Sequence, residues 1–311
     1  MVVWPQLAFA TPRKLPKAHE LRGRVVVVDI AFASEASSGG FLKITKPFIE
    51  GLGDRLAAWV DHHDHDLHVD YAGDSRFVLA TKAQHGACPE MVTPALVARI
   101  GAIDTIVCHT DFDGLCSAAK WINGGNEPYP GADDDARAID TRIGEPSAIG
   151  RRFDRAIRAR PRDVALLGLM VRHLASGLSD TSLWKTIDDA GAALVALEAS
   201  AREHARDYRV SAVQGHPWRS IALLKVPPGS TFDRTLLLLL GQERADIAIL
   251  VDRDNMTLAA PFDSKVNFLS LLSISGGMPT LVSLPAHRLC ETLLTLGVES
   301  PQLAMASTEP T

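Results

Sequence analysis

The chain has few cysteines: its 311 residues include only four, and none of them forms a C-x-x-C pair. This spacing excludes a zinc ribbon and a thioredoxin-type redox motif. Sparse, irregularly spaced thiols are typical of a reducing compartment, and we therefore expect a cytoplasmic protein. The cysteines are Cys88, Cys108, Cys116 and Cys290.

Long hydrophobic runs are also lacking. The clearest apolar segments, Val164–Val171 and Leu236–Leu240, are far shorter than the roughly 20 residues that cross a bilayer. The N-terminal stretch MVVWPQLAFATPRK has no basic segment in front of its apolar residues and is interrupted by Pro5. We therefore expect neither a secretory signal nor a membrane partner.

The sequence has no excess of positive charge, since 37 acidic residues face 32 basic ones and the net charge is −5. This balance excludes a protein that coats nucleic acid by bulk charge, although a local phosphate site remains compatible with it. The hydrophobic content of 46% excludes disorder, collagen and coiled coil as the main state. The length fits two domains of about 100–200 residues each.

What the sequence does contain is an uneven distribution of histidine, because five of the 11 lie between residues 62 and 85. The first two of these histidines end a short apolar segment. The chain has three such segments, and each of them ends in acids or histidines. Such segments predict parallel strands buried on both faces, whose carboxyl ends are the usual ligand site of an open α/β sheet. In the second segment, LAAW is less strand-like, and only its last residues are expected to be extended. The segments are Val25–Asp29, Leu56–His63 and Asp104–Asp113.

The remaining pattern predicts an α/β protein of two domains. A parallel-sheet catalytic domain is expected at residues 1–182, a linker helix at 183–207 and a smaller α/β substrate-binding domain at 208–311. Apolar periodicity and a Thr-Pro start predict the helices, and apolar or alternating runs predict the late strands. The helices are expected at 93–100, 118–123, 144–159, 164–176 and 181–207, and the late strands at 220–226, 246–251 and 256–259.

The groups at the predicted strand ends are carboxylates mixed with imidazoles. This ligand set suits Mn²⁺, Fe²⁺, Co²⁺ or Zn²⁺ better than Ca²⁺. The candidates outnumber the ligands of one tetrahedral zinc, which favours two ions at about 3.5–4 Å, the arrangement of phosphoester hydrolysis. Burying so many carboxylates without cations would be very unfavourable. The candidates are Asp29, Asp61, His62, His63, His109, Asp111, Asp113 and Asp180.

Several of these segments resemble the motifs of the DHH phosphoesterases, among them the RecJ-like exonucleases and the nanoRNases. VDHH at Val60–His63 resembles the family signature, and HTDFDGLCSAA at His109–Ala119 resembles its first motif, H-x-D-x-D-G. VVVVD, ending at Asp29, is similar to the second motif, and GLSDTSLW, with Asp180, to the fourth. SISGGMPTLVSLP resembles the glycine-rich GGGHP loop of the associated C-terminal domain. The resemblance spans roughly residues 20–290 through short motifs.

The chain departs from the family pattern in two places and offers an alternative at a third. Its motifs stand in the order second, third, first, fourth, which implies a circular permutation of the catalytic domain. Met278 stands where the glycine loop of the family usually has histidine. Asp140 follows the first motif as in family order and is an alternative to Asp29 for the second motif. We prefer Asp29 because four valines precede it and because it comes before DHH.

The resemblance implies a two-metal centre in which Asp29 bridges both ions. His63 would contact the substrate phosphate, and Asp61 would orient the histidines from behind. Asp29, His62, His63, Asp111 and Asp113 would form the catalytic group. The other ligands would divide between the ions, with His109 and Asp111 at one and His62, Asp113 and Asp180 at the other.

In the late domain, Gly276 and Gly277 would let backbone N–H groups approach a phosphate. His287 and Arg288, shortly after this loop, are further candidates for phosphate binding. The expected cofactor is a pair of Mn²⁺ ions, with Mg²⁺ or Co²⁺ as alternatives.

The sequence therefore predicts a Mn²⁺-dependent phosphoesterase. Its expected substrates are phosphodiesters at nucleic-acid ends, in short single-stranded oligonucleotides or in small nucleotides. One alternative is a phosphomonoesterase or an inorganic pyrophosphatase, and another is a non-catalytic nucleotide-binding module that retains the metals. The sequence leaves the oligomeric state open, with a homodimer as one alternative.

Overall fold

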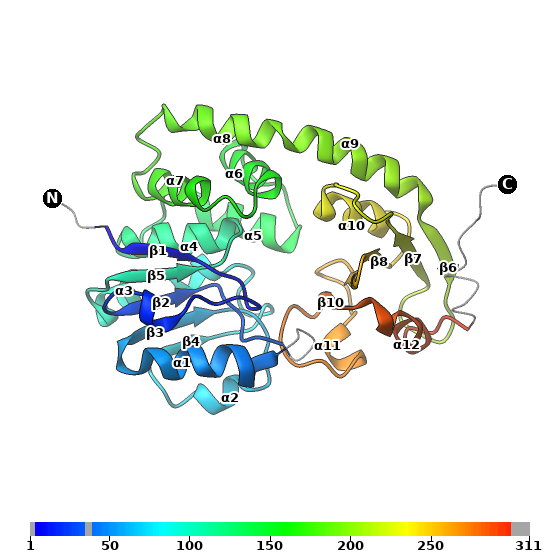
Figure 1. Ribbon diagram of the computed structural model, residues 1–311, viewed down its shortest axis with the longest axis horizontal. Helices are drawn as coiled ribbons and strands as arrows, with labels where there is room; N and C mark the ends of the chain where they lie inside the picture. Colours follow the sequence, from blue (N-terminus) through cyan, green and yellow to red (C-terminus); the bar gives the residue numbers. More distant parts are fainter. Residues whose placement is uncertain (1–3, 35–38, 300–311) are drawn as a thin grey trace. The chain divides into compact units, whose positions relative to one another are not determined.

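The computed structural model describes residues 4–34 and 39–299, and these residues divide into two compact units (Figure 1). The first unit comprises the residues up to Leu194 together with Ser275–Gly277. The second comprises Val195–Ile274 and the residues from Met278 onward. The division lies inside helix α9 (Leu194–His204), within the segment for which the sequence predicts a linker helix.

The first unit is built around a parallel sheet. Among the described residues its strand order is β1-β5-β2-β3-β4, and every pairing is parallel (Figure 1). The three strands predicted from the sequence are therefore direct neighbours, with β2 between β5 and β3, and the predicted α/β fold is confirmed. The strands are β1 (Gln6–Phe9), β2 (Val25–Val28), β3 (Leu56–Asp61), β4 (Phe77–Leu79) and β5 (Thr105–Cys108).

Strand β3 is extended along its whole length, although LAAW is less strand-like than the valines of β2. Trp59 is fully buried, and its Nε1 donates a hydrogen bond to the Ile30 carbonyl at 2.9 Å. Burial of this side chain therefore decides the strand, since strand preference depends strongly on packing. The helices of the unit are α1 (Lys46–Leu52), α2 (His68–Tyr71), α3 (Pro94–Ile100), α4 (Phe112–Ile122), α5 (Ala132–Thr141), α6 (Ala148–Ala159), α7 (Val164–Ala175) and α8 (Leu183–Ala192).

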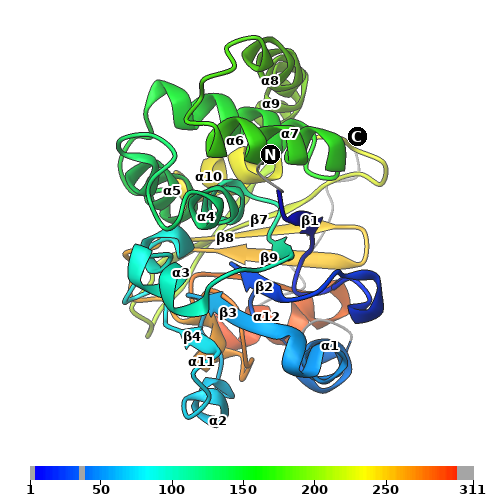
Figure 2. The same ribbon diagram turned by 90° about the vertical axis from the view of Figure 1, so that its left-hand side faces the viewer.

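Helices cover both faces of this sheet, which explains why its strands are apolar on both sides. Val26 and Val28 of β2 pack in a core with residues of α3 to α8. Val25 and Val27 point the other way and pack with α1. Figure 2 shows α1 on one side of the strands and α4, α6 and α7 on the other. The polar residues that follow the strands therefore gather at the carboxyl edge of the sheet.

The helix predicted at residues 181–207 is divided into three successive segments. Helix α8 ends at Ala192, α9 begins at Leu194, and a 3-10 helix at Ala205–Asp207 follows. Gly191 lies just before the first break. A glycine weakens a helix because it has more backbone freedom to lose.

The second unit has a mixed sheet, as expected for a smaller α/β domain. Within the described residues its order is β10-β9-β8-β7-β6, with β7 and β8 parallel and the other pairs antiparallel. Residues of α10 pack with β7 and β8 in a core of their own. The elements are β6 (Arg209–Ala212), β7 (Ser220–Lys225), α10 (Arg234–Gln242), β8 (Ile247–Asp252), β9 (Asn255–Ala259), α11 (Phe268–Leu271), β10 (Leu281–Pro285) and α12 (Leu289–Thr295).

None of the helices within residues 4–34 and 39–299 combines the length and the apolar character needed to cross a membrane.

Candidate metal centre

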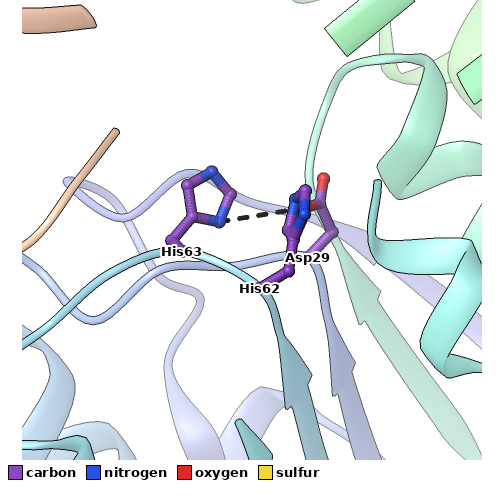
Figure 3. Close-up of side chains that lie close together, drawn as sticks. All are labelled: Asp29, His62 and His63. Carbon is purple, nitrogen blue, oxygen red and sulfur yellow. Dashed lines mark ion pairs between the residues drawn. The ribbon is translucent and has the colours of Figure 1, made fainter. Parts of the chain in front are cut away.

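Three neighbouring strands end at one edge of the first sheet, and each is followed by a residue with a ligating side chain. Asp29 follows β2, His62 follows β3 and His109 follows β5. Because the strands are parallel and adjacent, these side chains start from the same edge (Figure 3 shows the first two). Asp29 and His109 are far apart in the sequence, but the fold brings them to the same edge of the sheet.

The backbone of Asp29 turns sharply where β2 ends. Its φ is 58°, in the left-handed region, whereas its N–H still donates to the Val60 carbonyl at 2.9 Å and so continues the pairing with β3. Aspartate tolerates this region better than most residues other than glycine. Such conformations persist where the surroundings enforce them, and they cluster at functional sites.

The carboxylate of Asp29 is buried and faces three imidazoles. Its Oδ1 lies 3.2 Å from His62 Nε2 and 4.0 Å from His63 Nδ1 (Figure 3). Its Oδ2 lies 3.6 Å from His109 Nδ1. Neither oxygen accepts a hydrogen bond from any of the described residues, and Asp29 is only 1% exposed. A buried carboxylate without hydrogen bonds is strongly destabilising, and a bound cation would remove that penalty.

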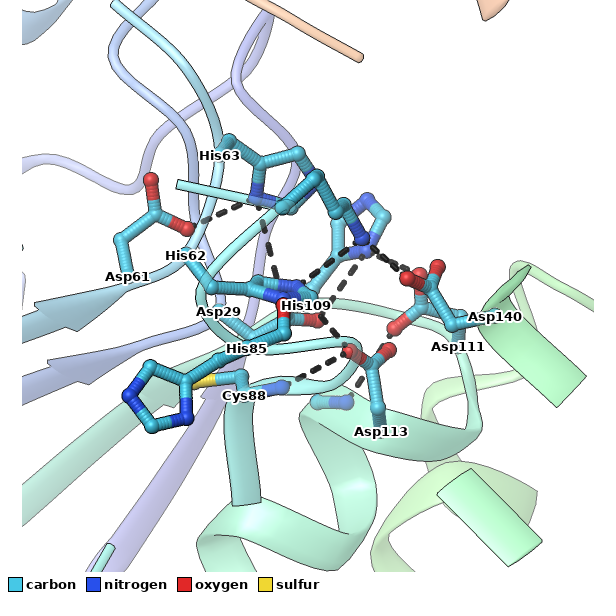
Figure 4. A network of polar contacts seen from close by, with 12 residues as sticks. Asp29, Asp61, His62, His63, His85, Cys88, His109, Asp111, Asp113 and Asp140 are labelled. Atoms are coloured by element: carbon cyan, nitrogen blue, oxygen red, sulfur yellow. Dashed lines mark hydrogen bonds and ion pairs between the residues drawn. The ribbon is translucent and has the colours of Figure 1, made fainter. Parts of the chain in front are cut away.

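The orientation of His62 is set by the main chain. Its Nδ1 donates a hydrogen bond to the carbonyl oxygen of His85 at 2.9 Å. Its Nε2 therefore points to the carboxylates, 3.2 Å from Asp29 and 3.3 Å from Asp113 Oδ2 (Figure 4). Asp113 Oδ2 also accepts from the N–H of Cys88 at 3.3 Å. Metal-ligating histidines typically have their second ring nitrogen held in this way.

The H-x-D-x-D-G segment forms the turn between β5 and α4. Asp111 caps the helix, with its Oδ1 accepting from Gly114 N at 3.2 Å, and its Oδ2 lies 2.5 Å from His109 Nδ1. A Cβ at Gly114 would lie 2.8 Å from the carbonyl oxygen of His109, so only glycine lets α4 begin this close to the strand. The glycine that ends the motif is therefore required for steric reasons.

Burial and neighbouring charges shift the pKa values of the histidines at the centre in different directions. For His62, burial and Lys82 would lower the pKa, but Asp113 and Asp29 outweigh them and raise it to about 11. Burial alone would lower the pKa of His109, but the carboxylates of Asp111 and Asp29 outweigh it and raise the pKa well above its usual value. Burial lowers the pKa of His63 well below its usual value, with Lys82 adding to the effect. These directions favour the protonated form of His109, whose proton a cation would have to displace, and the neutral form of His63.

Asp61 orients His63. Its Oδ1 accepts a hydrogen bond from His63 Nδ1 at 2.8 Å, and its own side chain is fully buried (Figure 4). Burial raises the pKa of Asp61. With Nδ1 engaged, His63 presents Nε2 as its free lone pair. The hydrogen bond fixes the ring of His63, and the role of Asp61 in a metal centre stays a prediction.

The centre also contains Lys82 and Asp140. Lys82 is 3% exposed, its Nζ lies 3.0 Å from His62 Nε2, and it forms an ion pair with Asp140 Oδ2. Burial by itself lowers the pKa of Lys82, but Asp140, Asp113 and Asp29 outweigh it and raise the pKa above its usual value. No pattern in TKAQHG distinguishes Lys82 from a lysine in a solvent-exposed loop, and sequence reasoning therefore missed it.

Three sets of side chains in the described residues have ligand atoms within 4.8 Å of one another. Asp29 belongs to two sets and His62 to two. The mixture of carboxylate and imidazole fits Mn²⁺ and related ions, and the unpartnered oxygens of Asp29 fit a bound cation. The sets are Asp29 with His62 and His63, Asp29 with His109 and Asp111, and His62 with Asp113 and Asp140.

Asp180 does not join these sets of described residues. It is exposed, and its Oδ1 accepts hydrogen bonds from the N–H and the Oγ of Ser182, at 3.1 Å and 2.6 Å, just before α8. An aspartate two residues before its partner commonly makes such a local turn. Asp140, from the C-terminal end of α5, lies in the set with His62 and Asp113 instead, and the ligand role of Asp180 stays a prediction.

The glycine segment contacts the histidine-rich loop. Gly277 N donates to the Asp64 carbonyl at 2.9 Å, and Asp64 N donates to the Gly277 carbonyl at 3.2 Å. A Cβ at Gly276 would lie 2.4 Å from a ring atom of His65. The N–H of Gly277 is thus engaged by the protein, contrary to the expectation that it is open to a phosphate. The two basic candidates lie in the second unit, at the 3-10 helix Ala286–Arg288, where Arg288 Nη2 binds Glu291 at 3.2 Å.

Comparison with known proteins gives several structural similarities, of which two are described here. No protein-family model and no curated protein sequence matches the chain. The structure of a pGpG-specific phosphodiesterase, PggH from Vibrio cholerae, is similar with a TM-score of 0.41 and 12% identity, covering 91% of this chain and all of the other. The structure of the exonuclease RecJ bound to manganese is similar with a TM-score of 0.43 and 14% identity, covering 94% of this chain and 77% of the other. The function of this chain is therefore inferred from its own residues.

Proposed function

We propose that the chain is a divalent-cation-dependent phosphoesterase of the DHH type. Its substrates would be phosphodiesters at nucleic-acid ends, in short oligonucleotides or in small nucleotides. The observation that carries this proposal is Asp29, a buried carboxylate without hydrogen bonds that faces three imidazoles at adjacent strand ends. A divalent cation supplies the chemistry of phosphoester hydrolysis, by lowering the pKa of water and offsetting charge on phosphoryl oxygens.

We assign the cation, Mn²⁺ or a similar ion, first to Asp29, His109 and Asp111, whose ligand atoms lie within 4.8 Å of one another. Their pair of carboxylates and one imidazole suits an ion of this class. The sequence predicts a second cation, and its position corresponds to the set of His62, Asp113 and Asp140. We propose Asp140 there as the ligand for which the family resemblance implies Asp180.

His63 is the residue of this group best placed to receive a substrate. Its side chain is 17% exposed, in contrast to the fully buried Asp61 behind it. Because Nδ1 donates to Asp61, Nε2 can accept a proton or a hydrogen bond from a substrate group. A protonated His63 would donate from the same atom to a phosphate oxygen, which would provide the phosphate contact that the resemblance implies for His63.

We also interpret the motif order as a circular permutation of the family pattern. The strands that end in Asp29, His62 and His109 are neighbours in the sheet, whatever their order along the chain. A site made of strand ends depends on adjacency in space, so a permuted chain can assemble the same set of ligands.

The test uses purified full-length protein, Mn²⁺ and four substrates: a dinucleotide, a longer single strand, a nucleoside 3′,5′-bisphosphate and pyrophosphate. We expect hydrolysis of a phosphodiester. Phosphate release from pyrophosphate alone would instead identify a pyrophosphatase, and bound metal without turnover of any substrate would identify a binding module. Asp111→Ala should remove both the activity and bound metal, and full activity in this variant would refute the assigned site.

A further inference from the structure

A lysine occupies the position that corresponds to the second cation. The Lys82 side chain is 2% exposed, and its Nζ pairs with Asp140 Oδ2 and lies 3.0 Å from His62 Nε2. His62 and Asp140 are two of the three members of the set completed by Asp113. The ammonium therefore lies among the same ligand atoms that a metal ion would need.

The ring of His62 can serve only one of these two cations. Its Nδ1 is engaged by the His85 carbonyl at 2.9 Å, which leaves the single lone pair of Nε2. In the unprotonated ring this lone pair either accepts a hydrogen bond from Lys82 Nζ or coordinates a metal ion, and it cannot do both. Mutual repulsion between an ammonium and a divalent ion at contact distance adds to this exclusion.

The remaining set does not involve Lys82. Asp29, His109 and Asp111 have ligand atoms within 4.8 Å of one another, and neither His62 nor Asp140 belongs to this set. The set of Asp29, His62 and His63, in contrast, depends on the same lone pair of His62. With Lys82 in place, one complete set of ligands is left for a divalent ion.

We propose that the ammonium of Lys82 takes the place of a second divalent ion, so that each chain binds one divalent ion, at Asp29, His109 and Asp111. This inference rests on the proposed function, because it assumes a cation-dependent centre. A tethered ammonium keeps one positive charge beside Asp113 and Asp140 at any metal concentration. The enzyme would then need only a single free ion for activity.

The number of bound ions tests this inference directly. Full-length protein is stripped with a chelator, reloaded with Mn²⁺, separated from free metal and measured by elemental analysis. We expect one equivalent in the unmodified chain and two in Lys82→Met, whose side chain has similar length and no charge. Electron paramagnetic resonance should show an isolated Mn²⁺ in the first case and a spin-coupled pair in the second.

Lys120→Met is the matched control. Lys120 is also a buried lysine, 6% exposed, but it pairs with Asp133 and with the Pro89 carbonyl rather than with the proposed ligands. This variant should lose stability and still bind one equivalent. A gain of a second ion in Lys120→Met would mean that the extra binding is unrelated to the position of Lys82.

The outcomes separate the two proposals. Two equivalents in the unmodified chain, or one in a folded Lys82→Met, would overturn the role of Lys82 and leave the metal centre standing. No bound metal in the unmodified chain would refute the proposed function itself. If Lys82→Met does not fold, the count and the resonance spectrum of the unmodified chain still decide between one ion and two.

Discussion

The Nδ1 atom of His62 lies 2.9 Å from the main-chain carbonyl oxygen of His85. This contact keeps Nε2 of His62 directed at Asp29 and Asp113, at 3.2 Å and 3.3 Å. The same nitrogen is 3.0 Å from Lys82 Nζ. One main-chain carbonyl thus determines that Nε2, rather than Nδ1, faces the two carboxylates and the ammonium.

Asp61→Asn should lower catalysis without unfolding the chain. The amide keeps the volume of the carboxylate but no longer provides the negative charge that holds His63 Nδ1, now 2.8 Å from Asp61 Oδ1. Loss of such an orienting partner typically reduces metal affinity or activity about 10–100-fold. The measurements are kcat/KM on a dinucleotide and the Mn²⁺ affinity. Asp66→Asn, an exposed position in the same loop, is the control and should behave like the unmodified chain.

Replacing Asp140 and Asp180 in turn tests which of the two aspartates belongs to the metal centre. Asp140→Asn removes the carboxylate that pairs with buried Lys82, and breaking a buried ion pair costs about 3–5 kcal/mol. Denaturant unfolding in the presence of a chelator should show this loss. Asp180→Asn should change stability and Mn²⁺ content little, because the exposed carboxylate bonds only with Ser182 among the hydrogen bonds described. If Asp180→Asn lost bound Mn²⁺ and Asp140→Asn did not, Asp180 would be the metal ligand, as the sequence predicts.

Mn²⁺ affinity should rise with pH. The carboxylates of Asp111 and Asp29 overcome burial and raise the pKa of His109, so the metal-free protein holds a proton on this ring at neutral pH. Binding of the ion expels that proton, and below the raised pKa the affinity should increase about tenfold per pH unit for one proton released. The measurement is calorimetric titration with Mn²⁺ between about pH 6 and pH 8, the range in which histidine usually titrates. Repeating it in buffers of different ionisation enthalpy gives the number of protons released. An affinity that falls with rising pH would contradict this assignment.

Gly114→Ala should damage the site through the backbone. The added Cβ would lie 2.8 Å from the carbonyl oxygen of His109, which forces α4 away from β5 and displaces both aspartates of the motif. Overpacking of this kind costs about 1–3 kcal/mol. We expect a lower midpoint of thermal unfolding together with loss of bound Mn²⁺. Gly73→Ala is the control, since a Cβ there meets no atom within 4 Å.

Much of the fold follows from local pattern, because runs such as VVVVD specify strands buried on both sides. The structure confirms that these runs form adjacent parallel strands. Strands β1 and β4 could not be predicted in this way, because they are only four and three residues long and have no distinctive pattern. The extended conformation of LAAW depends on the burial of Trp59, which no local rule expresses.

By itself the sequence determined which chemical groups follow the strands: Asp29, His62 and His109 stand directly after apolar runs, and strand periodicity makes such positions readable. Only the tertiary structure decided which other residues join them. Asp140 and Lys82 come from a helix end and a loop, and Asp180, on an equally suggestive motif, lies on the surface. The reason is physical, since packing of α5 and of the loop after β4 brings these side chains to the sheet edge, and packing depends on contacts between residues distant in the sequence.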